Sequence, residues 1–152
     1  MSRKQSIGIL IVFLLVMCSI FLFQSFLKSG YENLERSQQK WQKADIADYK
    51  IRIRAFGAWF DVTYSITIIN NEVESFERKC DRGDCEIGPQ PKDLMVDGLF
   101  SMVRKWSKGE RRENIDVVFD SKYGYPIYIS YDEMYSLDEE FVIDVISFEA
   151  IE

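Results

Sequence analysis

A long apolar run near the N-terminus, from Ile7 to Phe23, constrains the fold of this 152-residue chain more than any other feature. Its apolar character continues to Leu27, interrupted only by Gln24 and Ser25. A helix needs about 20 apolar residues to cross the hydrocarbon core of a bilayer. The run therefore predicts a transmembrane helix, with residues 1–28 forming a cytoplasmic tip and a membrane anchor.

Two alternatives to an uncleaved anchor stay open. A cleaved signal peptide has an apolar region of about 7–15 residues and a small-residue cleavage site. This run is longer, and Phe26-Leu27-Lys28 is a poor cleavage context. Lipid attachment at Cys18 would call for a small residue before the cysteine, where the chain has Met17. We favour the uncleaved anchor over cleavage or lipidation.

The basic residues around the run predict its orientation. Arg3 and Lys4 precede it and only Lys28 follows closely, so the N-terminus is expected in the cytoplasm and the rest outside. Removing Arg3 and Lys4 from the 19 basic residues leaves 17 against 25 acidic residues, a net charge of −8. Such an acidic domain is a poor partner for nucleic acid. We expect a single-pass protein of the cell membrane that contacts the bilayer through its N-terminal helix.

The absence of histidine limits the chemistry available. The chain has no histidine, which excludes a Ser-His-Asp triad, a Cys-His pair and a histidine metal site. A general base near neutral pH would have to be a carboxylate, lysine or tyrosine with a shifted pKa. We therefore expect a domain that is not an enzyme and that uses no cofactor.

The outer part of the chain predicts an α+β fold. Apolar residues recur at helical spacing from about residue 28 to 47, with 29–40 as a stalk, and again from about 93 to 107. Period-two alternation predicts strands near 49–54, 60–68, 72–79, 115–119, 125–131 and 140–148. Short turns between strands favour an antiparallel sheet of about six strands, with both helices on one face. The order is helix, three strands, helix, three strands, and the domain is expected to span 41–152.

A loop is predicted from Cys80 to Gln90, and it begins with a cysteine pair. Cys80 and Cys85 enclose four residues that include a glycine, so a tight loop can close. Because the compartment outside the membrane is oxidising, a disulfide between them is the favoured interpretation. So small a loop would contribute on the order of 2 kcal/mol in the chain-entropy model.

Acidic residues gather near the C-terminus. The members considered as calcium ligands are Asp132, Asp138, Glu139 and Glu140. Calcium takes oxygen ligands, but the spacing does not match an EF-hand loop and lacks its central glycine. A solvated acidic turn is the favoured interpretation, and a calcium site is the alternative.

Tyrosines surround a Gly-Pro turn in the same region. Gly124 can adopt positive φ, and Pro126 fits a strand start, edge or bulge, so a hairpin of defined register is predicted. A second interpretation is a binding surface, because several rings with polar tips lie close in sequence. Its candidate residues are Tyr123, Tyr125, Tyr128, Tyr131 and Asp132. Alternation separates Tyr128 from Tyr125 and Tyr131, so at most one set lines an exposed face.

A series of short motifs carries a resemblance to a known family. The motifs are Trp41, Asp48-Tyr49, Val96-Asp97-Gly98-Leu99-Phe100, Phe119-Asp120, Gly124-Tyr125-Pro126, Ile129, Asp132, Asp138-Glu139-Glu140, Val145 and Phe148. Over residues 41–148 the chain resembles small bacterial proteins, secreted or anchored by lipid or a membrane helix, that are known only as a domain of unknown function. Many members carry a lipid-attachment cysteine, and a central cysteine pair is common among them.

The resemblance implies a domain without implying an activity. We expect a membrane-anchored, extracytoplasmic, non-enzymatic domain that binds an envelope protein or another envelope component. The alternative is a sensor that binds calcium or another small ligand through the acidic, tyrosine-rich C-terminal part. A hydrolase that uses two carboxylates is a third hypothesis.

Overall fold

The computed structural model describes residues 33–84, 86–107, 114–132 and 140–151. The chain divides into two units, Met1–Arg36 and Ser37–Glu152, and the second contains the whole sheet. No helix among the described residues is long and apolar enough to cross a membrane. The apolar run from Ile7 to Phe23 lies outside the described residues, so the membrane anchor stays a prediction.

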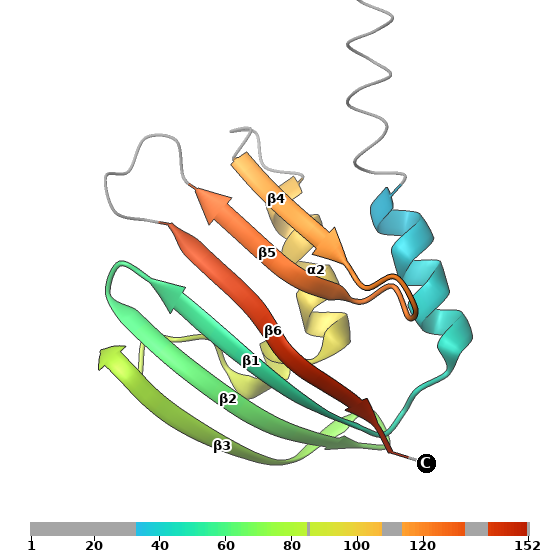
Figure 1. Cartoon of the computed structure of the whole chain (residues 1–152), viewed down its shortest axis with the longest axis horizontal. Helices are drawn as coiled ribbons and strands as arrows, with labels where there is room; N and C mark the ends of the chain where they lie inside the picture. The colour runs from blue at the N-terminus through green and yellow to red at the C-terminus, as the bar shows by residue number, and fades with distance from the viewer. Residues whose placement is uncertain (1–32, 85, 108–113, 133–139, 152) are drawn as a thin grey trace, which may run out of the picture. The chain divides into compact units, whose positions relative to one another are not determined.

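The second unit is built on one antiparallel sheet of six strands (Figure 1). Its strands are β1 (Tyr49–Gly57), β2 (Phe60–Ile69), β3 (Glu72–Gly83), β4 (Asn114–Phe119), β5 (Pro126–Asp132) and β6 (Phe141–Ala150). Their order is β3-β2-β1-β6-β5-β4, so the last strand, β6, pairs with β1 and joins the first three strands to the last three. The α+β class and the antiparallel six-stranded sheet predicted from the sequence are confirmed.

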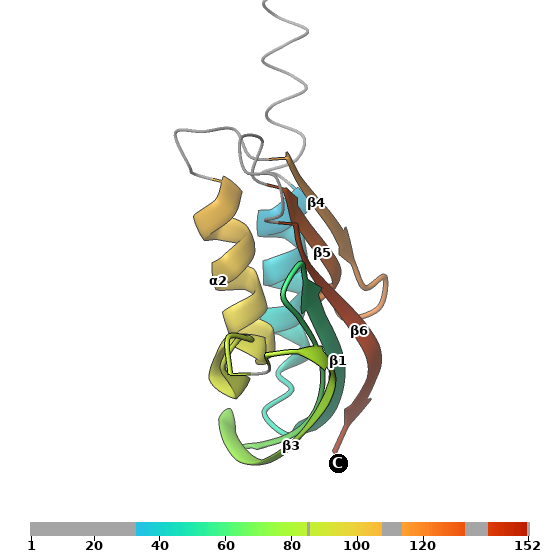
Figure 2. The same ribbon diagram turned by 90° about the vertical axis from the view of Figure 1, so that its left-hand side faces the viewer.

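Helices cover one face of this sheet. The N-terminal helix is described over residues 33–44, followed later by a 3-10 turn η1 (Pro91–Leu94) and by α2 (Val96–Ser107). Residues 37–44 and α2 lie on the same side of the sheet (Figure 2), and the side chain of Arg104 donates a hydrogen bond to that of Gln38. The arrangement with both helices on one face follows the prediction.

Two predicted boundaries are wrong. The second helix does not begin near Asp93, because Met95 is extended, with ψ at 155°, and separates η1 from α2. The loop predicted from Cys80 begins later, since β3 continues to Gly83 and pairs there with Phe60. Gly83 permits this with a positive φ of 76° and no Cβ, where an added Cβ would lie 1.9 Å from the carbonyl oxygen of Trp59.

Four aromatic residues, which we call the Trp41 cluster, join the N-terminal helix to the sheet. They are Trp41, Tyr49 of β1, Tyr125 and Phe148 of β6. The Trp41 ring centroid lies 5.7 Å from that of Tyr49, 6.1 Å from that of Tyr125 and 5.9 Å from that of Phe148, each edge-on. Phe148 also stacks on Tyr125 at 4.6 Å. Edge-to-face and stacked rings add to the stability from burial, so this cluster stabilises the packing of the helix on the sheet.

The turn before β5 brings Tyr125 into the Trp41 cluster. The backbone N–H of Gly124 donates to the carbonyl oxygen of Asp120, and that of Asp120 donates to Tyr125. Gly124 has a φ of 84°, and an added Cβ would lie 2.4 Å from the carbonyl oxygen of Ser37 on the helix. Pro126 opens β5 opposite Phe119, where the register shifts. The predicted Gly-Pro hairpin is confirmed, and its glycine allows the helix to approach.

Tyr49 also holds the first turn of α2. The buried backbone N–H of Val96 donates to the Tyr49 hydroxyl oxygen at 3.1 Å. The first N–H groups of a helix have no partner within the helix, so this hydroxyl satisfies one of them. Burial is the main reason that the pKa of Tyr49 rises to about 12, and burial likewise raises the pKa of Tyr125 to about 12.

Replacing Trp41 with alanine should destabilise the domain strongly. Loss of a buried tryptophan costs about 3–5 kcal/mol, and Trp41 is only 7 % exposed. The neighbouring Gln42 is exposed on the same helix, so Gln42→Ala should change the free energy of unfolding by less than about 0.5 kcal/mol. Urea unfolding of both variants measures the difference, and a Trp41→Ala loss as small as that of Gln42→Ala would contradict the packing role.

Tyr49→Phe should lower the free energy of unfolding by about 1–3 kcal/mol, because the N–H of Val96 loses its partner. Its pH dependence has a definite sign. The pKa of Tyr49 rises from 10.0 to about 12 on folding, so its contribution is complete below pH 10 and is lost as the pH rises from 10 towards 12.

Urea unfolding from pH 7 to 11 should therefore show the parent losing more stability above pH 10 than Tyr49→Phe does. The buried Tyr125 leaves part of this loss in the variant. Gln42→Ala, at an exposed position on the N-terminal helix, is the control and should show the same loss of stability above pH 10 as the parent. Identical high-pH profiles for the parent and Tyr49→Phe would contradict the assignment.

Candidate functional site

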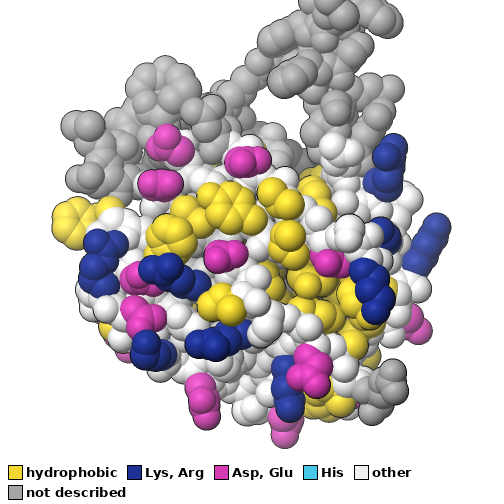
Figure 3. Space-filling model, viewed as in Figure 1, with side chains coloured by type: hydrophobic (Ala, Val, Ile, Leu, Met, Phe, Trp, Pro, Cys, Tyr) yellow, Lys and Arg dark blue, Asp and Glu magenta, His cyan; other side chains and the backbone are white. Residues whose placement is uncertain are grey.

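The second face of the sheet is not covered by a helix in the part of the chain that the structure describes (Figures 1 and 2). Strand alternation decides which side chains lie there. In β1, Tyr49, Ile51 and Ile53 are buried on the helix side, whereas Lys50 and Arg52 between them are exposed. Basic, acidic and apolar side chains share this uncovered face in the space-filling view (Figure 3).

Two rows of side chains cross four strands on this face. The register places Arg52 of β1 opposite Ser65 of β2 and Ser147 of β6, and Ser65 opposite Glu77 of β3. The neighbouring row contains Ser75 of β3, Thr67 of β2, Lys50 of β1 and Glu149 of β6. Directly opposite residues in an antiparallel pair point to the same face, so each row has one central cation, two hydroxyls and one carboxylate.

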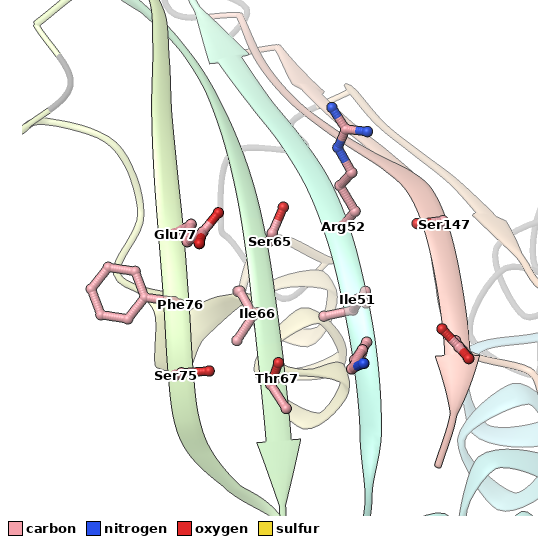
Figure 4. Close-up of a pocket in the computed structure, with 11 residues that line it drawn as sticks. Ile51, Arg52, Ser65, Ile66, Thr67, Ser75, Phe76, Glu77 and Ser147 are labelled. Atoms are coloured by element: carbon pink, nitrogen blue, oxygen red, sulfur yellow. The ribbon is translucent and has the colours of Figure 1, made fainter.

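A shallow hollow of about 480 Å³ lies over these rows. Its lining consists of the eight row residues together with Ile51, Ile66 and Phe76. Figure 4 shows Glu77, Ser65, Arg52 and Ser147 side by side on four strands, with Thr67 and Ser75 in the row below. Serine and threonine are small, so they leave space beside the two long cations. Its volume is in the range of about 300–1,000 Å³ found for small-molecule sites.

Arg54, the next basic residue of β1, is already paired. Its Nε donates to Oδ1 of Asp61 at 2.9 Å and its Nη2 donates to Oδ2 at 2.6 Å. The hydrogen bonds from Arg54 hold the pKa of Asp61 below its usual range. On the adjoining strand, Thr63 donates to Asp81, which also accepts from Lys79. These charges satisfy one another within the fold.

Arg52 and Lys50 differ from Arg54 in this respect. Among the described residues, neither side chain makes a hydrogen bond or an ion pair, although Glu149 lies opposite Lys50. Both side chains are exposed, and both line the hollow. The hollow therefore presents two uncommitted cations beside hydroxyl groups, which suits an anionic or strongly polar ligand.

The tyrosines proposed as a binding surface do not gather on one face. Tyr125 is buried in the Trp41 cluster, and Tyr123 lies 5.9 Å from Phe148 in the same region. Tyr131 stacks on Trp106 of α2 at 4.8 Å. Tyr128 lies opposite Asp144 on the uncovered face, and Asp132 is exposed at the end of β5. The period-two alternation of β5 puts Tyr128 and Tyr131 on opposite faces, so these residues do not form one surface.

The acidic cluster is only partly within the described residues. Asp132 and Glu140 are exposed, and Asp138 and Glu139 lie outside the described residues. Within the ranges that the structure describes, no group of three or more acidic or cysteine side chains could hold a metal ion. The calcium site stays a prediction.

The cysteine pair is likewise only half described. Cys80 is exposed on β3, opposite Val62, and Cys85 lies outside the described residues. The disulfide stays a prediction.

The sequence does not identify the hollow as a site. The alternation of Lys50, Arg52 and Arg54 with apolar residues places the three cations on one face. The alternation of Ser65 and Thr67 does the same in the next strand. The sequence does not show which strands are neighbours. Ser147 and Glu149 lie beside these cations because β6 pairs with β1.

Comparison with known proteins gives the family and no activity. No curated protein matches the chain, and no solved structure does. A family of unknown function (DUF6174) matches residues 33–150. This range includes every described strand and helix of the second unit. The expectation of a domain of unknown function is thereby confirmed, and the chain belongs to the family of unknown function DUF6174.

Proposed function

We propose that this chain is a membrane-tethered, extracytoplasmic binding module without catalytic activity. In this proposal the uncovered face of the sheet binds an envelope protein or another envelope component. The observation that carries the proposal is the hollow, where Lys50 and Arg52 have no partner among the described residues. The apolar run from Ile7 to Phe23 supports the tether, and the basic residues before it support the orientation.

The two faces of the sheet differ in burial and in charge pairing, and this difference supports binding at the hollow. The helix-covered face contains large buried side chains, including Tyr49, Ile53 and Tyr64. Lys50 and Arg52 contribute no pairing to the described structure, whereas the chain supplies Asp61 for Arg54. Exposed surface charges contribute little to stability on their own, so these two cations are available for a ligand.

The placement of the two carboxylates disfavours a hydrolase at the hollow. Glu77 is on β3 and Glu149 on β6, with β2 and β1 between them. Three strand spacings separate them, about 14 Å at the usual interstrand distance. Paired catalytic carboxylates in glycosidases are about 5–10 Å apart. A binding role for these acids fits the geometry better than shared catalysis.

A photo-crosslinking amino acid tests the surface directly. Placed at Ser65, in the middle of the hollow, within the full-length chain in its native membrane, it should give a discrete adduct that mass spectrometry identifies as an envelope component. Placed at Gln42, which is exposed on the N-terminal helix, it should not give that adduct. Arg52→Gln should abolish the Ser65 adduct without lowering the amount of protein.

Two results would contradict the proposal. One is the same adduct in equal yield from positions 65 and 42, which would mean indiscriminate contact. The other is a position 65 that gives no adduct although the crosslinker is incorporated and the protein is in the membrane.

A further inference from the structure

We infer that the hollow binds an extended peptide with a free C-terminal carboxylate, and that Arg52 is the residue that anchors this carboxylate. The inference rests on the proposed function and names the ligand class of the same surface. It starts from the contrast between Arg52 and Arg54, two arginines on the same face of one strand.

Arg54 shows where a carboxylate binds an arginine on this sheet. Arg54 lies opposite Thr63, and its carboxylate partner Asp61 comes two residues before Thr63 on β2. The contact uses two parallel hydrogen bonds, which is the arrangement that the planar guanidinium favours with carboxylates. The sheet thus holds a carboxylate diagonally across from Arg54.

The corresponding position beside Arg52 has no carboxylate. Arg52 lies opposite Ser65, and the residue two positions before Ser65 is Thr63. The hydroxyl of Thr63 already donates to Asp81 at 3.0 Å. Ser65 and Ser147 flank Arg52 on its two neighbouring strands and can donate to a bound anion. The residues directly opposite Arg52 are therefore both serines, and in this proposal the carboxylate that binds its guanidinium comes from the ligand.

The remaining charges of the hollow favour a peptide over a polyanion. Glu77 is in the same row as Arg52, two strands away, which is about 10 Å at the usual spacing. Three extended residues span about 10 Å, so the ammonium group of a tripeptide reaches Glu77 when its carboxylate binds Arg52. Glu77 and Glu149 would repel a polyphosphate or nucleic acid, as would the net charge of −8 on the chain after the apolar run.

The test uses the full-length chain in lipid nanodiscs and trialanine with both ends free as the probe. NMR follows the side-chain Nε–H resonances of Arg52 and Arg54 during the titration. Trialanine should shift the Arg52 resonance in a saturable way and leave that of Arg54 in place. Trialanine amide, which lacks the carboxylate, should bind about tenfold to a hundredfold more weakly, and N-acetyl-trialanine should lose part of the affinity.

Variants connect this binding to the hollow. Arg52→Gln should weaken trialanine binding by at least about tenfold, whereas Lys43→Gln, at an exposed position on the N-terminal helix, should not. Unchanged thermal unfolding of Arg52→Gln establishes that the variant is folded. Arg52→Lys should restore only part of the affinity, since lysine lacks the bidentate fork.

The outcomes separate this inference from the proposed function. Equal affinities for trialanine and its amide, or no shift of the Arg52 resonance with any peptide, would overturn the carboxylate-anchor inference. If the Ser65 crosslink still forms in that case, the uncovered face remains the binding surface for a different ligand. Loss of both signals would overturn both.

Discussion

The buried side chain of Tyr49 connects the two helices to the middle of the sheet. Its ring packs against Trp41 and Phe148, and its hydroxyl oxygen accepts the backbone N–H of Val96 at the start of α2. One buried side chain thus contacts both helices and the central pair of strands. Because successive residues of a strand point to opposite faces, directing Tyr49 to the helices directs Lys50 and Arg52 to the uncovered face.

This constraint separates folding from binding in the sheet. Motifs such as Gly124-Tyr125-Pro126 and Phe148 meet at the Trp41 cluster, where packing, a tight turn and a close helix approach account for them. The uncovered face has a different composition, with hydroxyls, two cations and two carboxylates around the hollow. The residues that best identify the family resemblance are therefore structural, and the proposed binding residues lie elsewhere.

The sequence predicts local structure well here because its periodicities are strong. The alternation in β1 and β2 predicts those two strands, and the apolar face of α2 predicts that helix apart from its start. Alternation gives little signal where both faces of a strand are polar, so the sequence predicts a loop from Cys80, where β3 continues to Gly83. The hollow depends on which strands are neighbours. β6 pairs with β1, although β2, β3, α2, β4 and β5 all lie between them in the sequence. Nothing local to either strand encodes that pairing.

The central claim is that the two cations of the hollow serve binding and not folding. Replacing Lys50 and Arg52 together by threonine, a residue that favours strands, tests it by urea unfolding of the full-length protein. The account predicts a free energy of unfolding within about 0.5 kcal/mol of the parent's. A loss of about 3 kcal/mol or more, comparable to removal of a core aromatic residue, would contradict it and make the uncovered face part of the folding core.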